Sequence, residues 1–558
     1  MGQGPLVRRR SLLRGVGLGT GAAAIGGLGW VAAGARRGRD LPLAGGWIGA
    51  DAERGHVLRD GRRPAGEREP LVRQAAVLIV GAGIAGLACA RALHQRGIDD
   101  VHLLELEDQP GGNSRGHTMG GMACPLGAHY LPVPDERAPE LVELLAELGL
   151  CRRQQGRWVY DERHLCHSPQ ERLFIGSADD GHWHEGLLPP VEALPAAERA
   201  GTLQAYRRFA ARVGEQVRRG AFSVPTARAG WNEALARLDA TSFSAWLDAE
   251  GLRAPALRWY LDYCCRDDYG AGTARVSAWA GLHYFASRHG FHAPGDDTAA
   301  DEDGGVLTWP DGNAWLVRRL AAPLGDRLHT GRTVWQVDEG RERVVVDAWD
   351  HAARRLERWT ARHVVLATPL FIATRLTRQP VPALQQAFAT MHWAPWLVAN
   401  LQLDAALNDP PGAPPSWDNV VYGGQALGYV DAMHQSTRPH AGPTVLSVYW
   451  ALGGDTADAE QARRRELLDM PWTAWAERSI AELAIAHPDL RPKVRRADLM
   501  RYGHAMSIPV PGLRGSAALQ ALQRPAGRLA FAHADLSGYS VFEEAFFHGH
   551  RTGRRLAV

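Results

Sequence analysis

The chain has 558 residues, which is enough for several domains or for one large enzyme with an inserted subdomain. Its 63 basic and 61 acidic residues leave a net charge of +2, so there is no basic excess and a nucleic-acid partner is not expected. The six cysteines form no C-x-x-C pair, and we therefore expect neither a bound metal nor a thioredoxin-like motif.

The first 35 residues have the pattern of an export signal. An arginine-rich start precedes an uncharged, weakly apolar run over 15–35 that ends in Ala-Gly-Ala, as in a cleavable signal peptide. Arg9 and Arg10 resemble a twin-arginine signal, which implies the twin-arginine translocase as a partner and a periplasmic location. An uncleaved anchor is the alternative, but no membrane span is expected in the mature chain. Residues 36–70 are predicted to be a linker or an arm packed outside a domain.

A glycine-spaced turn follows the short apolar strand expected over 77–80. Gly81 permits a tight turn, Gly83 lets the backbone approach a pyrophosphate, and Gly86 lets the next helix pack against the strand. A second strand ends at Glu105, close to the usual spacing of about 20 residues for an acidic side chain that binds a ribose. The pattern predicts a dinucleotide site. The residues expected to form it here are Gly81, Gly83, Ile84, Ala85, Gly86 and Glu105.

Later segments resemble the flavin-containing amine oxidoreductase family, which includes monoamine and polyamine oxidases. The resemblance is carried by ELEDQPGGNSR (105–115), LGAHY (126–130), GRTVWQV (331–337), RHVVLATPL (362–370) and the closing stretch 527–556. It implies FAD, held without a covalent bond. It places Gly127 and Ala128 near the isoalloxazine and Val334 at the adenine. The further residues that it implies at the cofactor are Gly111, Gly112, Arg115, Asp535, Val541 and Phe542.

The same resemblance implies a fold of the α/β plus α+β class. A Rossmann-like FAD-binding domain of the glutathione-reductase type is expected over 71–135, 305–375 and 500–558. A discontinuous substrate-binding domain is expected over 136–304 and 376–499. The closing motif would then bring Asp535 to the ribityl–pyrophosphate region, and the helix that starts near Val541 would point its N-terminus at the flavin.

The chemistry implied is that of an FAD-dependent oxidoreductase that transfers a hydride from an amine, such as a polyamine or an amino-acid derivative, to flavin N5. The electron acceptor would be O2, a quinone or a redox protein. Two alternatives stay open, a desaturase or protoporphyrinogen-oxidase-like enzyme and a non-catalytic flavin-binding protein.

Two features depart from the family pattern. The strand over 392–403 lacks the usual lysine, and Val541 stands where many members have a cage tyrosine. We therefore take His129, Tyr502 and His504 as the catalytic candidates, because they lie in or near the flavin segments and because histidine can exchange protons near neutral pH. The adjacent Asp267 and Asp268 would either attract a cationic substrate or form an Arg–Asp pair and a helix cap.

Overall fold

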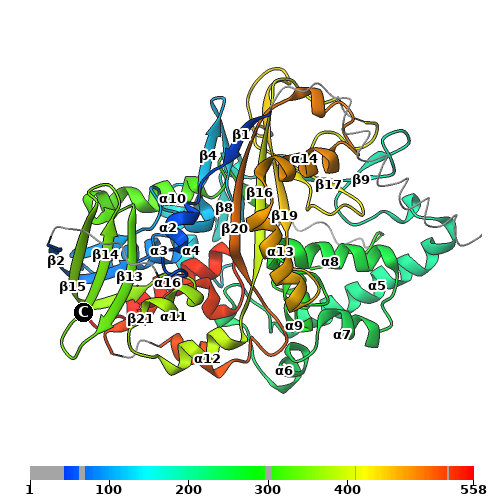
Figure 1. The fold of residues 1–558 in the computed structure, drawn as a ribbon. Coiled ribbons are helices and arrows are strands. Elements are labelled where there is room, and N and C mark those ends of the chain that lie inside the picture. Colours follow the sequence, from blue (N-terminus) through cyan, green and yellow to red (C-terminus); the bar gives the residue numbers. More distant parts are fainter. Residues whose placement is uncertain (1–42, 62–68, 289, 296–304, 409, 525–526) are drawn as a thin grey trace, which may run out of the picture.

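In the computed structural model the chain forms two large sheets that lie side by side, with helices around both (Figure 1). The structure describes residues 43–61, 69–288, 290–295, 305–408, 410–524 and 527–558. The predicted export signal over 1–35 lies outside these ranges. Over the ranges given, no helix combines the length and the apolar character needed to cross a bilayer.

The first sheet contains the predicted strand–helix–strand unit. Strand β2 (Leu71–Val80) leads through the glycine turn into helix α3 (Ile84–His94), and β3 (Val101–Leu104) pairs in parallel with β2. The last six residues of β2 are all buried, as expected for a parallel strand covered on both faces. The strand order is β12-β3-β2-β15-β14-β13, and β21 pairs with β15. The Rossmann-like fold is thereby confirmed. The other strands are β12 (Leu328–His329), β13 (Arg332–Glu339), β14 (Val344–Asp350), β15 (Arg355–Leu366) and β21 (Leu529–Phe531).

The final helix, α16 (Phe542–Arg555), packs closely on α3 although the two are more than 400 residues apart. A Cβ at Gly549 would lie 2.0 Å from the carbonyl oxygen of Ala85, so only glycine permits this approach. Phe542 and Phe546 of α16 are buried in the same core as Leu87 of α3. The packing brings the N-termini of both helices toward the edge of the sheet where β2 and β3 end.

The second sheet has the order β1-β20-β16-β19-β18-β17-β9-β10. Helices α5 (Ala196–Arg219), α8 (Pro255–Tyr269) and α9 (Ala278–Ala286) share a core with it and cover one side (Figure 1). The strand β20 spans the boundary predicted at residue 500 and pairs in this sheet along its length. The strands are β1 (Ala44–Trp47), β9 (Glu171–Ile175), β10 (His182–Glu185), β16 (His392–Leu403), β17 (Asp418–Val421), β18 (Tyr429–Asp431), β19 (Thr444–Ala451) and β20 (Val494–Ile508).

Candidate functional site

A long cavity of about 350 Å³ runs from the carboxyl ends of β2 and β3 to the N-terminus of α16. Carboxyl ends of parallel strands are the usual place for a dinucleotide in such a sheet. Most of the predicted cofactor residues line this cavity, although they come from distant parts of the chain. They are Gly81, Gly83, Ile84, Ala85, Glu105, Gly111, Gly112, Ala128, Val334, Asp535, Val541 and Phe542.

Three of the predicted residues do not line this cavity, and one of them, Gly127, lines a second cavity described below. Gly86 lies behind the turn, where a Cβ would be 2.0 Å from the carbonyl oxygen of Gly81, so it permits the close packing that was expected of it. Arg115 also lies behind the wall. Its Nε donates to the carbonyl of Gly112 at 3.0 Å and its Nη1 to that of Gly49 at 2.6 Å. The structure thus places Arg115 as a support for the Gly-Gly loop and not in the cavity.

One end of the cavity carries the groups expected around an adenosine. The carboxylate of Glu105 accepts hydrogen bonds from the backbone N–H of Ala82 at 2.8 Å and of Glu107 at 3.0 Å. Burial raises the pKa of Glu105, while these two hydrogen bonds act in the opposite direction. The backbone N–H of Arg332 donates to the carbonyl of Glu105 at 2.7 Å, which brings the start of β13 to this end of the cavity. Arg332 and Val334, both in β13, line the cavity there.

The other end contains a buried carboxylate with an open hydrogen-bonding position. Asp535 Oδ2 accepts from the backbone N–H of Leu370 at 2.9 Å and from Trp393 Nε1 at 3.1 Å. Burial alone would raise the pKa of Asp535, but nearby His533 and these donors outweigh it and lower the pKa below its usual value. Asp535 Oδ1 and Thr368 Oγ1 are buried at the cavity without a hydrogen-bond partner in the protein. A hydroxyl of FAD would donate to Asp535 Oδ1, and Thr368 Oγ1 would donate to a phosphate, so the residues present fit this cofactor.

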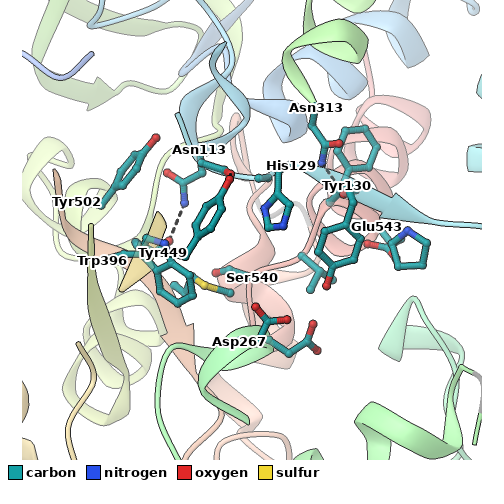
Figure 2. Close-up of a pocket in the computed structure, with 18 of the residues that line it drawn as sticks. Asn113, His129, Tyr130, Asp267, Asn313, Trp396, Tyr449, Tyr502, Ser540 and Glu543 are labelled. Atoms are coloured by element: carbon teal, nitrogen blue, oxygen red, sulfur yellow. Dashed lines mark hydrogen bonds between the residues drawn. The ribbon is translucent and has the colours of Figure 1, made fainter. Parts of the chain in front are cut away.

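A second cavity, of about 130 Å³, opens from the α16 end of the first (Figure 2). Besides Phe542, five aromatic side chains line it, and Gly127 lines it as well. The rings are those of His129, Tyr130, Trp396, Tyr449 and Tyr502. The two cavities share six lining residues, which are Asn113, Ala128, Ala505, Ser540, Val541 and Phe542. A cofactor in the first cavity would therefore present one end to the second.

Hydrogen bonds from the aromatic residues fix the LGAHY loop. The ring of His129 stacks on Tyr449 with centroids 4.4 Å apart, and Tyr449 Oη donates to the carbonyl of Gly127 at 3.1 Å. Tyr502 Oη donates to the carbonyl of Leu126 at 2.9 Å. Burial lowers the pKa of His129 to about 3 and raises that of Tyr502 to about 12, so both side chains are neutral near pH 7. Both candidates reach the second cavity and shape its wall, while the hydroxyl hydrogen of Tyr502 is donated to the LGAHY loop.

The third catalytic candidate lies elsewhere. His504 lines the first cavity and not the second, and its ring lies on Phe371 with centroids 4.5 Å apart. Burial lowers its pKa to about 4. Tyr539, the tyrosine two residues before the cage position at Val541, does not line the second cavity either. It packs in the core against Tyr269 and His283, with ring centroids 5.6 and 5.5 Å away. The expectation that His504 contacts the substrate is therefore not supported by its position.

Acidic side chains form another wall of the second cavity. Asp268 pairs with Arg288 at 3.3 Å, and Arg266 pairs with Asp262 at 3.3 Å, one turn before it in α8. Asp267 lines the cavity, and over the described ranges it makes no ion pair with a cationic side chain. Burial and then the charge of Asp268 raise the pKa of Asp267 to about 7.

The sequence identified the acidic pair in α8 but did not indicate which carboxylate faces the cavity. Several lining residues were also missed, some within the quoted motifs but not singled out there and others outside any motif. They are Asn113, Tyr130, Arg288, Asn313, Tyr449, Ser540 and Glu543.

Relatives of the chain agree with this arrangement. AofH of Mycobacterium tuberculosis, which carries the name of a flavin-containing monoamine oxidase, is 28% identical over 405 residues, or 70% of this chain and 77% of AofH. Coproporphyrinogen III oxidase of Mycobacterium leprae is 42% identical over 97 residues, which is 17% of this chain and 20% of the relative. A double mutant of putrescine oxidase has a similar fold, with a TM-score of 0.62 and 20% identity over 86% of this chain and 98% of that one.

A family comparison covers far more of the chain than the sequence motifs do. The model of the flavin containing amine oxidoreductases matches residues 84–557, which include both helix N-termini at the first cavity and every side chain of the second. The chain therefore belongs to the flavin-containing amine oxidoreductase family and is a flavin-dependent oxidoreductase that uses FAD.

Proposed function

We propose that the protein oxidises a small amine that binds in the second cavity, next to the flavin held in the first. The observation that carries this proposal is the junction of the two cavities at Ala128 and Val541, both shared by their walls. The flavin, when bound, supplies hydride acceptance at N5. Product release and hydrolysis of the resulting imine would then give an aldehyde and a smaller amine.

The side chains of the second cavity suit an amine in two ways. Its aromatic wall removes water from the reacting carbon, and such desolvation favours the neutral, reactive form of the amine. Asp267, when ionised, offers a carboxylate to a second, charged ammonium group, as in a diamine, and so orients the molecule. The N-terminus of α16 points at the junction, where its unpaired N–H groups favour negative charge on a reduced cofactor.

The absence of the usual lysine bears on the electron acceptor. Strand β16 presents Trp396 to the second cavity and contains no lysine in its sequence HWAPWLVANLQL. We therefore include O2, a quinone and a redox protein as acceptors to be compared. The comparison is made by reoxidising the substrate-reduced protein with each of them and following the return of the oxidised flavin spectrum.

Anaerobic reduction of the bound flavin tests the proposed chemistry. Purified full-length protein is mixed with monoamines, diamines and amino acids, and bleaching of the visible flavin absorbance is followed. At least one amine should bleach the flavin absorbance at a rate sufficient for catalytic turnover. Bleaching by a porphyrinogen and by no amine would favour the alternative that the short coproporphyrinogen oxidase match supports. Bleaching by dithionite alone would favour a non-catalytic flavin-binding protein.

We also propose that the protein is exported to the periplasm by the twin-arginine translocase. The support is the Arg9–Arg10 pair before the apolar run that ends at Ala35. Fusion of residues 1–70 to a reporter that works only after export tests this, with Arg9→Lys/Arg10→Lys as the control. Export that survives the double substitution would contradict the route.

A further inference from the structure

We propose that the arm formed by residues 43–61 completes the cofactor site and that Arg54 binds the adenosine diphosphate half of FAD. The arm was expected to be a linker or an external segment. The structure instead gives it two anchoring regions and a position on the wall of the first cavity, through Arg54, Gly55 and Leu58.

The arm is anchored first on the second sheet. β1 adds a parallel edge strand to β20, in the register Ala44 to Arg496, and the backbone N–H of Ile48 continues the ladder by donating to the carbonyl of Leu499 at 2.8 Å. Trp47 packs beside the core of that sheet, and its ring lies 4.5 Å below the guanidinium of Arg501. These contacts fix the position at which the arm leaves the sheet.

The arm is anchored next on the loop that follows β3, which carries the second cofactor motif. Arg115 donates to the carbonyl of Gly49 at 2.6 Å, and the backbone N–H of Asp51 donates to Glu107 Oε2 at 3.1 Å. Arg115 also holds the carbonyl of Gly112, so one guanidinium connects the arm to the Gly-Gly loop. Direct hydrogen bonds thus connect the arm to the cofactor loop.

A short helix then sets the direction of Arg54. Helix α2 (Ala52–His56) begins at Asp51, whose Oδ1 accepts from the backbone N–H of both Glu53 and Arg54 at 3.0 Å. The guanidinium of Arg54 lies between two carboxylates, with Nη1 2.7 Å from Asp108 Oδ1 and Nε 3.1 Å from Asp51 Oδ2. These ion pairs hold the side chain, 19% exposed, at the cavity.

The surroundings of Arg54 identify which half of the cofactor it would meet. A Cβ on Gly331 would be 4.0 Å from Arg54 Nη1, and Gly331 precedes Arg332, which is bonded to Glu105. Arg54 therefore lies at the end of the cavity that Glu105 and Arg332 define. A planar guanidinium can stack on an adenine or bind a phosphate, and both groups belong to the adenosine diphosphate half.

The test measures cofactor binding rather than turnover. Arg54→Gln should speed FAD release from the purified full-length protein about tenfold or more, followed by the rise in free-flavin fluorescence, because a charge-assisted contact is lost. ADP should bind the FAD-free protein more weakly by a similar factor, whereas riboflavin binding should not change. The matched control is Arg59→Gln in the same arm, since Arg59 is exposed, pairs with Asp60 and does not line the cavity.

A second variant keeps the proposal testable if Arg54→Gln disturbs the arm. A Cβ added at Gly55 would have no protein atom within 4 Å, so we expect Gly55→Phe to leave the protein folded while its ring occupies space in the cavity. It too should weaken FAD and ADP but not riboflavin. Unchanged FAD release in both variants, or an equal loss of riboflavin binding, would overturn the proposal.

Discussion

The two cavities are built in different ways from the same chain. The wall of the cofactor cavity includes glycine turns and the N-termini of two helices, as at Gly83 and Phe542. The wall of the second cavity consists of large side chains from separate segments, such as His129, Asp267 and Tyr449. The difference teaches that a common cofactor is recognised by backbone geometry, which leaves motifs in the sequence, whereas a particular substrate is recognised by side chains that converge only after folding.

The largest effect should follow a change in the backbone wall. Gly83 has φ of −72°, and a Cβ there would meet only the Cα of Gly112, at 3.9 Å, so the backbone accepts a side chain at this position and we choose Gly83→Val. The added methyls would lie where the pyrophosphate passes. We expect FAD affinity to fall by about 100-fold or more, measured by flavin absorbance per protein after dialysis. Gly201→Ala, on the exposed face of α5, is the control and should keep full flavin content.

A smaller loss should follow a change in the buried carboxylate of Asp535. Asp535→Asn keeps the shape of the side chain but removes its charge and an acceptor, and such a hydrogen bond contributes about 1.5–3 kcal/mol. FAD should therefore bind about 10- to 100-fold more weakly, as measured by fluorescence titration. Undiminished affinity would mean that Asp535 Oδ1 does not meet the cofactor.

The second cavity should respond without loss of FAD. The raised pKa of Asp267, about 7, means that its carboxylate becomes charged as the pH rises from 6 to 8. A quaternary ammonium inhibitor, whose own charge does not titrate, should bind about tenfold more tightly at pH 8 than at pH 6. Asp267→Asn should make the binding weak and independent of pH while the flavin content stays full. A similar pH dependence in both proteins would exclude Asp267 as the cation ligand.

The smallest effect concerns His129, whose pKa of about 3 lies below that of an unfolded histidine. The unfolded chain takes up a proton at this side chain as the pH falls below about 6.5, so this histidine makes the fold less stable in acid. His129→Phe keeps the stacking on Tyr449 and should remove about 2 kcal/mol of the stability lost between pH 7 and pH 5. Urea unfolding at both pH values measures it, and an unchanged loss would contradict a neutral His129.

The sequence predicted the backbone wall well because its residues lie in short motifs. The turn from Gly81 to Gly86 and the start of α16 near Val541 were placed within a residue or two. Arg115 was assigned to the cofactor because it belongs to a motif, yet its side chain points to Gly49, a contact that only the fold creates.

Side-chain directions were harder to predict. Tyr502 and His504 are two residues apart on β20 but line different cavities, because the strand has an irregular register with β16 between Ala394 and Trp396. Arg54 lies in a segment without periodicity, and its role depends on the pairing of β1 with a strand about 450 residues later. Long-range pairing of this kind leaves no local signal.

An experimental structure of the FAD-bound protein is the most direct test of how the two cavities are joined. We expect the adenine beside Glu105, Val334 and Arg54, and the isoalloxazine between Ala128 and Val541 with N5 facing His129 and Tyr449. A flavin ring away from the junction, or a cofactor in the reverse direction, would contradict the account.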